Sequence, residues 1–279
     1  MTIIAFVGSV FSPYYAWARQ RGTPDPENFC GLNVALYGRG GKRWSMTERG
    51  ASALKRSGEA MVVGPSALTF DGTALTIRIE EVTVPIPSRL RGVVRIEPAA
   101  MTPGPYALDE AGRHQWWPIA PAGRAIVRME RPQLAWQGKA YLDSNWGSEP
   151  LEDGFVSWDW SRAPHPDGGA VLYDMQRRQG GQKTLALLFD QQGGAAPFTP
   201  PRPAPLPTAP VWRIARAIHS EGEAKVVKTL EDTPFYARSL VKTRLAGAEV
   251  TAVHESLSLE RFRSGWVKML LPFRMPRAG

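Results

Sequence analysis

Four residues in two short pairs have the types and the spacing for acid chemistry. His114 and Trp116 are two apart in RHQWWP, and Tyr141 and Asp143 are two apart in AYLDSNWG. Residues two apart in an extended chain point to the same face, so each pair presents both side chains on one side of a strand. A buried Asp must be paired, hydrogen-bonded or kept protonated, because its ionised form loses solvation. The pattern therefore indicates either a structural network or a site for acid chemistry.

Each of these side chains also has a purely structural explanation. A lone His such as His114 is more commonly a hydrogen-bonded structural residue, and a Trp in a β domain usually packs in the core. An Asp before Ser-Asn, as at Asp143, can form a turn. Other carboxyls are weaker candidates: Asp153 precedes a glycine in a turn signal, and Asp159 lies between two indoles expected to pack inward. The residues alone leave both interpretations open.

Metal and serine chemistry find no support in the sequence. The four histidines include no pair with the spacing of zinc ligands, and no G-x-S-x-G motif supplies a nucleophile. Cys30 is the single cysteine, which excludes an intramolecular disulfide and gives no support for a thiolate metal site. We therefore expect no metal at the candidate site.

The elements that must position these residues are predicted to be short β-strands. The chain has 27 Gly and 25 Pro among 279 residues, which suits many strands joined by turns and argues against a helical bundle. Around the candidate residues and toward the C-terminus, we expect strands at 114–119, 124–130, 133–136, 139–146, 155–160, 170–176, 236–245, 249–258 and 265–271. The sequence predicts an all-β fold of antiparallel sandwiches or barrels.

The chain is long enough for two β domains, and we expect them at residues 1–132 and 133–279, because a boundary near Pro132 divides it evenly. Seven prolines fall within 197–210. Proline cannot continue a central strand, so this stretch is predicted to be a semi-rigid surface loop of the second domain.

The net charge of +8 favours a polyanionic partner. There is no lysine-rich helix or nucleic-acid motif, so no nucleic-acid partner is expected and a membrane surface fits better. Residues 259–279 carry five Lys and Arg against the single Glu260, with Phe262, Trp266 and Phe273 interleaved. This mixture predicts peripheral contact with anionic lipid, and an ordinary final strand with a solvated face is the alternative.

Long runs of the chain resemble the carotenoid 1,2-hydratases, also called hydroxyneurosporene synthases, of purple phototrophic bacteria. The runs are IIAFVGSVFSPYYAWARQRG, NFCGLNVALYG, RWSMTERG, AGRHQWWPIAP and YLDSNWG, and the likeness covers essentially the whole chain. The wider superfamily includes AttH-like bacterial proteins and fungal decalin-forming pericyclases. The chain's similarity to this superfamily implies two lipocalin-like (calycin-like) β domains, with the site in a cavity at or near their interface.

The resemblance also implies a reaction and the residues that perform it. The family's H-x-W and Y-x-D pairs fall on His114, Trp116, Tyr141 and Asp143. The implied activity is that of a cofactor-independent hydro-lyase, which adds water across the terminal C1–C2 double bond of an acyclic carotene such as neurosporene or lycopene. Asp143 would protonate C2, which requires that an apolar pocket raise its pKa from about 3.9. Trp116 and Tyr141 would offer π faces to the cation, and His114 would orient Asp143 or accept a proton from the attacking water.

The expected partners are therefore an acyclic carotenoid and water, with the protein peripheral on the cytoplasmic side of the inner, photosynthetic membrane. Two other classes fit the same residues. A carotenoid- or lipid-binding lipocalin-like carrier would use the cavity without an acid, and a pericyclase or isoprenoid cyclase would use it to fold a polyene.

Overall fold

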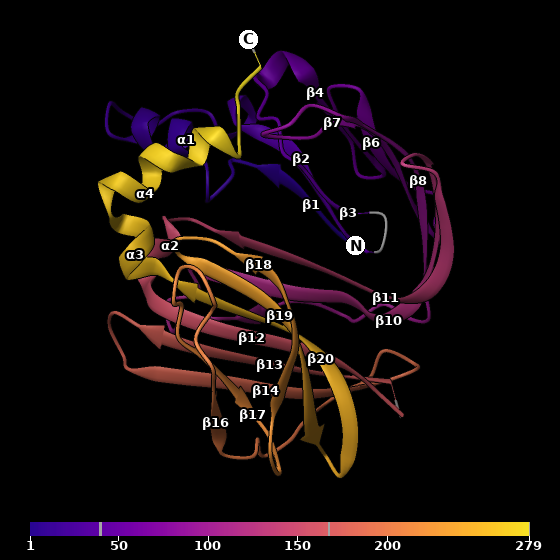
Figure 1. Cartoon of the computed structure of the whole chain (residues 1–279), viewed down its shortest axis with the longest axis vertical. Helices are drawn as coiled ribbons and strands as arrows, with labels where there is room; N and C mark the ends of the chain where they lie inside the picture. Colours follow the sequence, from indigo (N-terminus) through magenta and orange to yellow (C-terminus); the bar gives the residue numbers. More distant parts are fainter. Residues whose placement is uncertain (39–40, 167, 279) are drawn as a thin grey trace. The chain divides into compact units, whose positions relative to one another are not determined.

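The computed structural model describes residues 1–38, 41–166 and 168–278, and β-strands dominate it (Figure 1). Gly279, the last residue of the predicted basic segment, lies outside the described residues. The strands pair antiparallel in sheets of three, eight, seven and two strands within this part of the chain. The predicted all-β, antiparallel class is confirmed.

The chain divides into two compact units, each assembled from separate stretches. Unit 1 consists of Met1–Glu97, Arg124–Gly138 and Lys268–Gly279, and unit 2 consists of Pro98–Gly123 and Lys139–Val267. Two domains with one boundary between residues 132 and 133 stay a prediction. All four candidate residues, at 114, 116, 141 and 143, belong to unit 2.

Unit 1 contains a three-stranded sheet, in the order β1-β2-β3, and the strands β4 to β8 of the eight-stranded sheet. Their bounds are β1 Thr2–Val7, β2 Cys30–Gly38, β3 Gly41–Ser45, β4 Leu54–Arg56, β5 Ala60–Val63, β6 Ser66–Phe70, β7 Leu75–Val82 and β8 Arg89–Pro98, whose last residue falls in unit 2. The helical turns are α1 Pro13–Arg19, η1 Pro26–Asn28, η2 Ala51–Ala53 and η3 Leu271–Phe273. The core includes Leu32, Val34, Ile77, Ile79, Leu90, Val94 and Val127.

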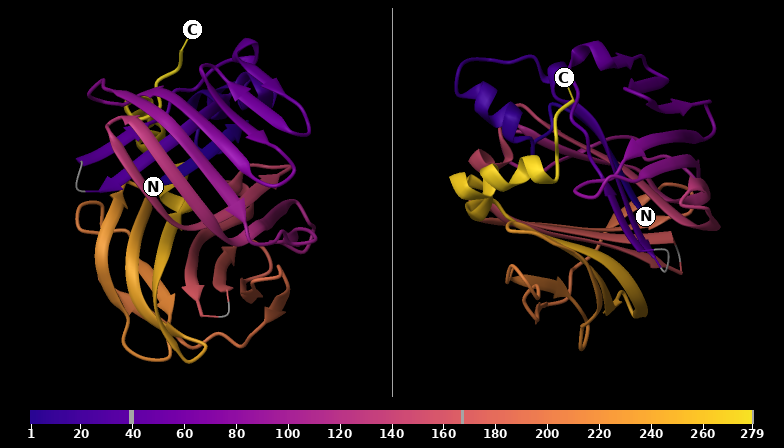
Figure 2. Two further views of the ribbon diagram at one scale, coloured as in Figure 1. Left: turned by 90° about the vertical axis from the view of Figure 1, so that its right-hand side faces the viewer. Right: turned by 45° about the horizontal axis from the view of Figure 1, so that its top comes forward.

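Unit 2 is built on the seven-stranded sheet, in the order β15-β14-β13-β12-β20-β19-β18. Its strands are β12 Phe155–His165, β13 Gly168–Arg177, β14 Gln182–Asp190, β15 Ala195–Pro197, β18 Lys225–Asp232, β19 Tyr236–Leu245 and β20 Ala248–Ser258. The strands β18, β19 and β20 lie side by side in both figures (Figures 1 and 2). The remaining elements are β9 Tyr106–Ala107, β16 Pro203–Leu206, β17 Arg216–His219, α2 Leu151–Gly154 and α3 Leu259–Arg263.

The central strand β12 gives the seven-stranded sheet two chemically different faces. Trp160 pairs with Tyr173 of β13 and with Glu255 of β20, so these three side chains share one face. Asp159 points to the opposite face, where an aliphatic core is closed by residues of β16 and β17 such as Leu206. The sheet thus has one aromatic and charged face and one mainly aliphatic face.

Apart from β8, of which Pro98 alone falls in unit 2, three elements run across the division between the units: β10 His114–Arg131, β11 Leu134–Gly147 and α4 Gly265–Leu270. The sequence predicted two separate strands in place of β10 and two in place of β11. Both predictions were wrong, because each element is one continuous strand. The prolines between 118 and 121 remain extended because the φ of proline is compatible with a strand, and Gly138 continues β11 without a turn.

Two further predictions need correction. Residues 265–271 were expected to form a strand, but Gly265–Leu270 is the helix α4. The run 197–210 was expected to be a loop, yet it includes β16, which pairs only with β17 in a two-stranded sheet. A two-stranded sheet tolerates prolines because each of its strands has an unpaired edge. No helix in the described ranges combines the length and the apolar composition that crossing a bilayer requires.

Candidate active site

The first pair of candidate residues lies at the start of β10. His114 and Trp116 are 2% and 0% exposed, while the intervening Gln115 is more exposed. The alternation confirms that both side chains point to the same, inward face. Trp116 also pairs with Tyr106 of the short strand β9 in the sheet register, and their rings lie 5.7 Å apart. The Tyr106 ring thereby helps to fix the indole.

The second pair lies in β11, and the first pair reaches it through Trp116. Trp116 Nε1 donates a hydrogen bond to Asp143 Oδ2 at 3.0 Å. The Tyr141 hydroxyl donates to the same oxygen at 3.1 Å. Arg162 lies with its guanidinium carbon 5.5 Å from the centre of the Tyr141 ring, which helps to fix that ring. Residues 27 positions apart in the chain thus converge on one carboxyl oxygen.

The two donors decide where a proton can sit on Asp143. A carboxyl oxygen accepts about two hydrogen bonds, so Oδ2 is saturated by the indole and the phenol. Oδ1 accepts no hydrogen bond from any residue that the structure describes. In the neutral acid, Oδ2 is therefore the carbonyl oxygen and Oδ1 carries the proton.

The surroundings of Asp143 favour this neutral form. Removal from solvent raises its pKa to about 6, and the negative charge of Glu255 adds to that effect. The hydrogen bonds from Trp116 and Tyr141 and the positive charge of Arg238 act in the opposite direction but do not cancel it. A carboxyl that keeps its proton to about pH 6 is a competent general acid.

Aromatic rings form the walls around this carboxyl. Trp116 contacts Tyr173 edge to face at 5.6 Å, and Tyr173 contacts Trp158 in the same manner at 5.6 Å. The Tyr141 ring lies 5.5 Å from Trp160. The indole N–H of Trp160 is buried and has no acceptor among the described residues. These rings offer π faces to a cation and leave one buried donor free for a water molecule.

An ion pair lies on the same face of the sheet. Glu255 stands opposite Trp160 in β20, and Arg238 stands opposite Glu255 in β19. The guanidinium binds one carboxylate oxygen of Glu255 through Nη2 at 2.7 Å and Nε at 2.8 Å. The Arg238 side chain is almost fully buried, whereas that of Glu255 is 22% exposed. Sequence reasoning did not identify either residue.

His114 is held apart from the acid. Its Nε2 lies 3.2 Å from Glu149 Oε1, and its ring contacts Phe155 edge to face at 4.8 Å. Two glycines pack on the imidazole so closely that a Cβ at Gly147 would lie 2.6 Å from Nδ1, and one at Gly154 would lie 2.8 Å from Nε2. No hydrogen bond or ion pair joins His114 to Asp143 among the described residues.

A second titratable cluster occupies the opposite face of β12. Asp159 accepts a hydrogen bond from Ser256, and desolvation raises its pKa to about 7. His254 lies 3.6 Å from the Asp159 carboxylate, and burial lowers its pKa to about 4. Asp159 does not share the aromatic face, so it is a weaker candidate for the acid. Asp153 is exposed in α2.

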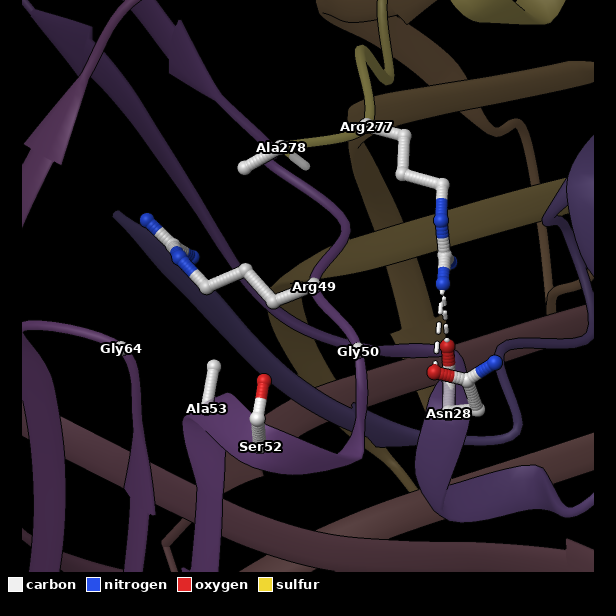
Figure 3. Close-up of a pocket in the computed structure, with 8 residues that line it drawn as sticks. All are labelled: Asn28, Arg49, Gly50, Ser52, Ala53, Gly64, Arg277 and Ala278. Atoms are coloured by element: carbon white, nitrogen blue, oxygen red, sulfur yellow. Dashed lines mark hydrogen bonds between the residues drawn. The ribbon is translucent and has the colours of Figure 1, made fainter.

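Other places in the molecule offer little for cofactor or metal binding. Within the described ranges, no three His, Cys, Asp or Glu side chains gather closely enough to hold a metal ion. A pocket of about 500 Å³ is lined by Arg49, Arg277 and other residues of unit 1 (Figure 3). Arg49 is paired with the buried Glu81 at 2.8 Å, and Arg277 with the buried Glu48 at 2.6 Å. These pairs neutralise the arginines, so the pocket is not an evident anion site.

Comparison with known proteins identifies the family of this chain. The family described as carotenoid hydratase CrtC matches residues 3–279. The chain belongs to this family. An acyclic carotenoid 1,2-hydratase of Thiocapsa roseopersicina is 59% identical over 281 aligned positions, which cover 100% of this chain and 69% of the relative. A second, of Rubrivivax gelatinosus, is 49% identical over 99% of this chain and 69% of the relative.

A solved structure supports the fold of this family member. The crystal structure of a putative AttH from Nitrosomonas europaea superposes with a TM-score of 0.61 and 16% sequence identity. The match covers 85% of this chain and 82% of the AttH chain. The predicted AttH-like architecture is therefore confirmed at the level of the fold.

The structure brings three of the four predicted site residues together. Trp116, Tyr141 and Asp143 form one hydrogen-bonded group, while His114 lies behind the aromatic wall. The ion pair Arg238–Glu255 was missed, because nothing in the local sequence of either strand marks it. The alternation of Trp158 and Trp160 was the signal for the wall residues of β12, since it places both indoles on one face.

Proposed function

We propose that this protein adds water to the terminal C1–C2 double bond of an acyclic carotenoid such as neurosporene or lycopene. The observation that carries the proposal is the geometry of Asp143, whose Oδ2 accepts from Trp116 and Tyr141 and whose Oδ1 is free to hold a proton. Membership of the carotenoid hydratase family supplies the substrate class.

In the first step, Asp143 Oδ1–H transfers its proton to C2 of the alkene. The π electrons form the new C2–H bond, and C1 becomes a tertiary carbocation. The faces of Trp116, Tyr141 and Tyr173 stabilise this cation, and such interactions contribute roughly 2 kcal/mol when water is excluded. The two donors to Oδ2 stabilise the carboxylate that the step leaves behind.

In the second step, a water oxygen forms a bond with C1 and loses one proton. The Asp143 carboxylate accepts that proton, which restores the acid for the next cycle. The buried N–H of Trp160 is suited to hold the water before attack, because it has no acceptor among the described residues. Oxidation states balance without an electron carrier, so the scheme uses no redox cofactor.

His114 takes a supporting part in this scheme. It contacts Phe155, which in turn contacts Trp158 at 5.8 Å, so the imidazole holds the aromatic wall in position. Its bond to Glu149 fixes the orientation of the ring. We propose a positioning role for His114 rather than direct proton transfer.

The test is to incubate the purified protein with neurosporene or lycopene and to measure product masses. We expect gains of one or two waters, deuterium at C2 in deuterated water and oxygen-18 at the C1 hydroxyl in labelled water. Bound carotenoid without product would identify a carrier, and a cyclic product of unchanged mass would identify a cyclase. A hydroxyl oxygen derived from dioxygen would overturn hydration as the reaction.

We further propose that the protein works at an anionic membrane surface, on the cytoplasmic side of the photosynthetic membrane. Acyclic carotenes are long hydrocarbons that partition into lipid, so an enzyme acting on their ends must meet them at a bilayer. The net charge of +8 favours the anionic surface of such a bilayer.

A further inference from the structure

The aromatic and charged face of the seven-stranded sheet carries a hydrogen-bond donor and an acceptor that lack partners. The donor is the indole N–H of Trp160, which is buried and has no acceptor among the described residues. The acceptor is a carboxylate oxygen of Glu255. Arg238 binds the other oxygen, and no described residue donates to this one. All three residues belong to unit 2.

The sheet register brings the donor and the acceptor together. Trp160 of β12 stands directly opposite Glu255 of β20, so both side chains leave the sheet on the same side. Side chains in such a pair have Cβ atoms about 5 Å apart. A molecule that binds both must accept a hydrogen bond from the indole and donate one to the carboxylate. Water does both, whereas the hydrocarbon end of an acyclic carotene does neither.

This position is open to water and adjoins the acid. The Glu255 side chain is 22% exposed, so a water molecule can reach it. Its pairing with Arg238 favours a carboxylate, which is a stronger acceptor than a neutral group. On the other side, Trp160 contacts the ring of Tyr141 at 5.5 Å, and the Tyr141 hydroxyl donates to Asp143. A water between the indole and the carboxylate would therefore lie beside the group that holds the acid.

We propose that Trp160 and Glu255 together hold the water molecule that attacks C1, with the indole donating to its oxygen and the carboxylate accepting one of its hydrogens. The inference rests on the proposed function, whose attacking water it places. One lone pair of the water oxygen stays free to form the bond with C1. The other hydrogen leaves as the proton that Asp143 accepts, and the hydrogen bound to Glu255 remains in the product hydroxyl.

The carbocation has two competing fates that reveal whether water is in position. Capture by water gives the alcohol. Without a placed water, the cation returns a proton to Asp143 and becomes an alkene again. In deuterated water this alkene carries deuterium, because Asp143 delivers a deuteron from solvent and the cation can lose an original proton. The ratio of deuterated alkene to alcohol therefore measures how well water is placed.

The experiment compares this ratio, by mass spectrometry, between the wild type and two variants incubated with lycopene. Glu255→Gln and Trp160→Phe should each raise it about tenfold, the equivalent of one lost hydrogen bond. In Glu255→Gln, Arg238 should hold the amide oxygen, so the amide nitrogen replaces the free acceptor. Trp160→Phe keeps a ring but removes the N–H. Glu249→Gln, at an exposed position of the same strand, is the control and should leave the ratio unchanged.

The ratio separates placement of water from other effects of these substitutions. Both fates follow the same proton transfer, so a change in the protonation of Asp143 alters the total turnover and leaves the ratio unchanged. A variant that is merely damaged likewise loses deuterated alkene and alcohol together. An unchanged ratio in Glu255→Gln or in Trp160→Phe would overturn the inference.

A measurement without substrate keeps the inference distinct from the proposed activity. A high-resolution crystal structure of the unliganded protein should show an ordered water within hydrogen-bonding distance of Trp160 Nε1 and of the Glu255 carboxylate. The Trp160→Phe protein should lack it. Such a water in a protein that neither hydrates nor deuterates a carotene would support the water site and overturn the proposed function. Its absence from the wild type, or its persistence in Trp160→Phe, would overturn the inference.

Discussion

Arg238 binds one carboxylate oxygen of Glu255 through two nitrogens, with Nη2 and Nε at 2.7 and 2.8 Å from that atom. Both residues act electrostatically on Asp143, and they act in opposite directions: Glu255 raises the pKa of the acid and Arg238 lowers it. The ion pair therefore adjusts the pKa of the acid, which burial raises most strongly.

Glu255→Gln should shift the pH dependence of the reaction. Asp143 must be protonated to act, so activity falls as pH rises through its pKa of about 6. Removing the negative charge at Glu255 makes ionisation of Asp143 easier, and the alkaline limb should move to lower pH by roughly half a pH unit. The measurement is kcat against pH. Glu249→Gln, at an exposed position of the same strand, is the control. A shift to higher pH would contradict this electrostatic assignment.

Tyr141→Phe should shift the same limb in the other direction. The Tyr141 hydroxyl stabilises the ionised carboxylate through its bond to Oδ2, so its loss raises the pKa of Asp143. The alkaline limb should move up by about half to one pH unit, the equivalent of one ordinary hydrogen bond. Tyr106→Phe keeps the ring that contacts Trp116 and should leave the limb in place. If kcat depended on pH in the same way for both variants, the Tyr141 hydroxyl would not be a hydrogen-bond donor to Asp143.

Asp143→Asn should abolish hydration while the protein stays folded. The amide has nearly the same volume but no acidic proton, and general acid catalysis contributes on the order of 100- to 10,000-fold. Product formation is measured by chromatography, and folding by circular dichroism. Asp153→Asn, in the exposed turn α2, should keep full activity. Turnover by a folded Asp143→Asn protein would direct attention to Asp159.

Gly154→Ala should displace His114. The new Cβ would lie 2.8 Å from Nε2, closer than carbon and nitrogen can approach without movement. Overpacking of this kind costs about 1–3 kcal/mol, and it should lower both the melting temperature and the rate. Gly138→Ala is the matched control, because nothing lies within 4 Å of a Cβ there. Equal behaviour of the two variants would show that the imidazole needs no fixed position.

The sequence predicted which candidate side chains share a strand face, but it did not predict the hydrogen bonds that join the two strands. The period of two is a property of any extended backbone, so the pairing of His114 with Trp116 and of Tyr141 with Asp143 followed directly. The hydrogen bond from Trp116 to Asp143 depends on how the two long strands β10 and β11 pair and twist. Single-strand patterns do not contain that information, and the family resemblance supplied the grouping instead.

Two misses have different physical causes. The residues next to Glu255 and Arg238 in sequence form no pattern that marks either as a functional residue. Only the sheet register, which places the two opposite each other, reveals the pair. The prediction of a strand at α4 failed because six residues are too few to distinguish a period of two from one of 3.6. Its Trp, Val and Leu residues also fit either state.

The interleaving of the two units limits how the chain can be cut. Unit 2 takes Trp116 from Pro98–Gly123 and Asp143 from Lys139–Val267, with a stretch of unit 1 between them in sequence. Fragments 1–132 and 133–279 would each hold one member of the Trp116–Asp143 hydrogen bond. Neither fragment could form the doubly bonded carboxyl by itself. The severed protein would behave as a split enzyme, whose activity reports the concentration at which its two pieces recombine.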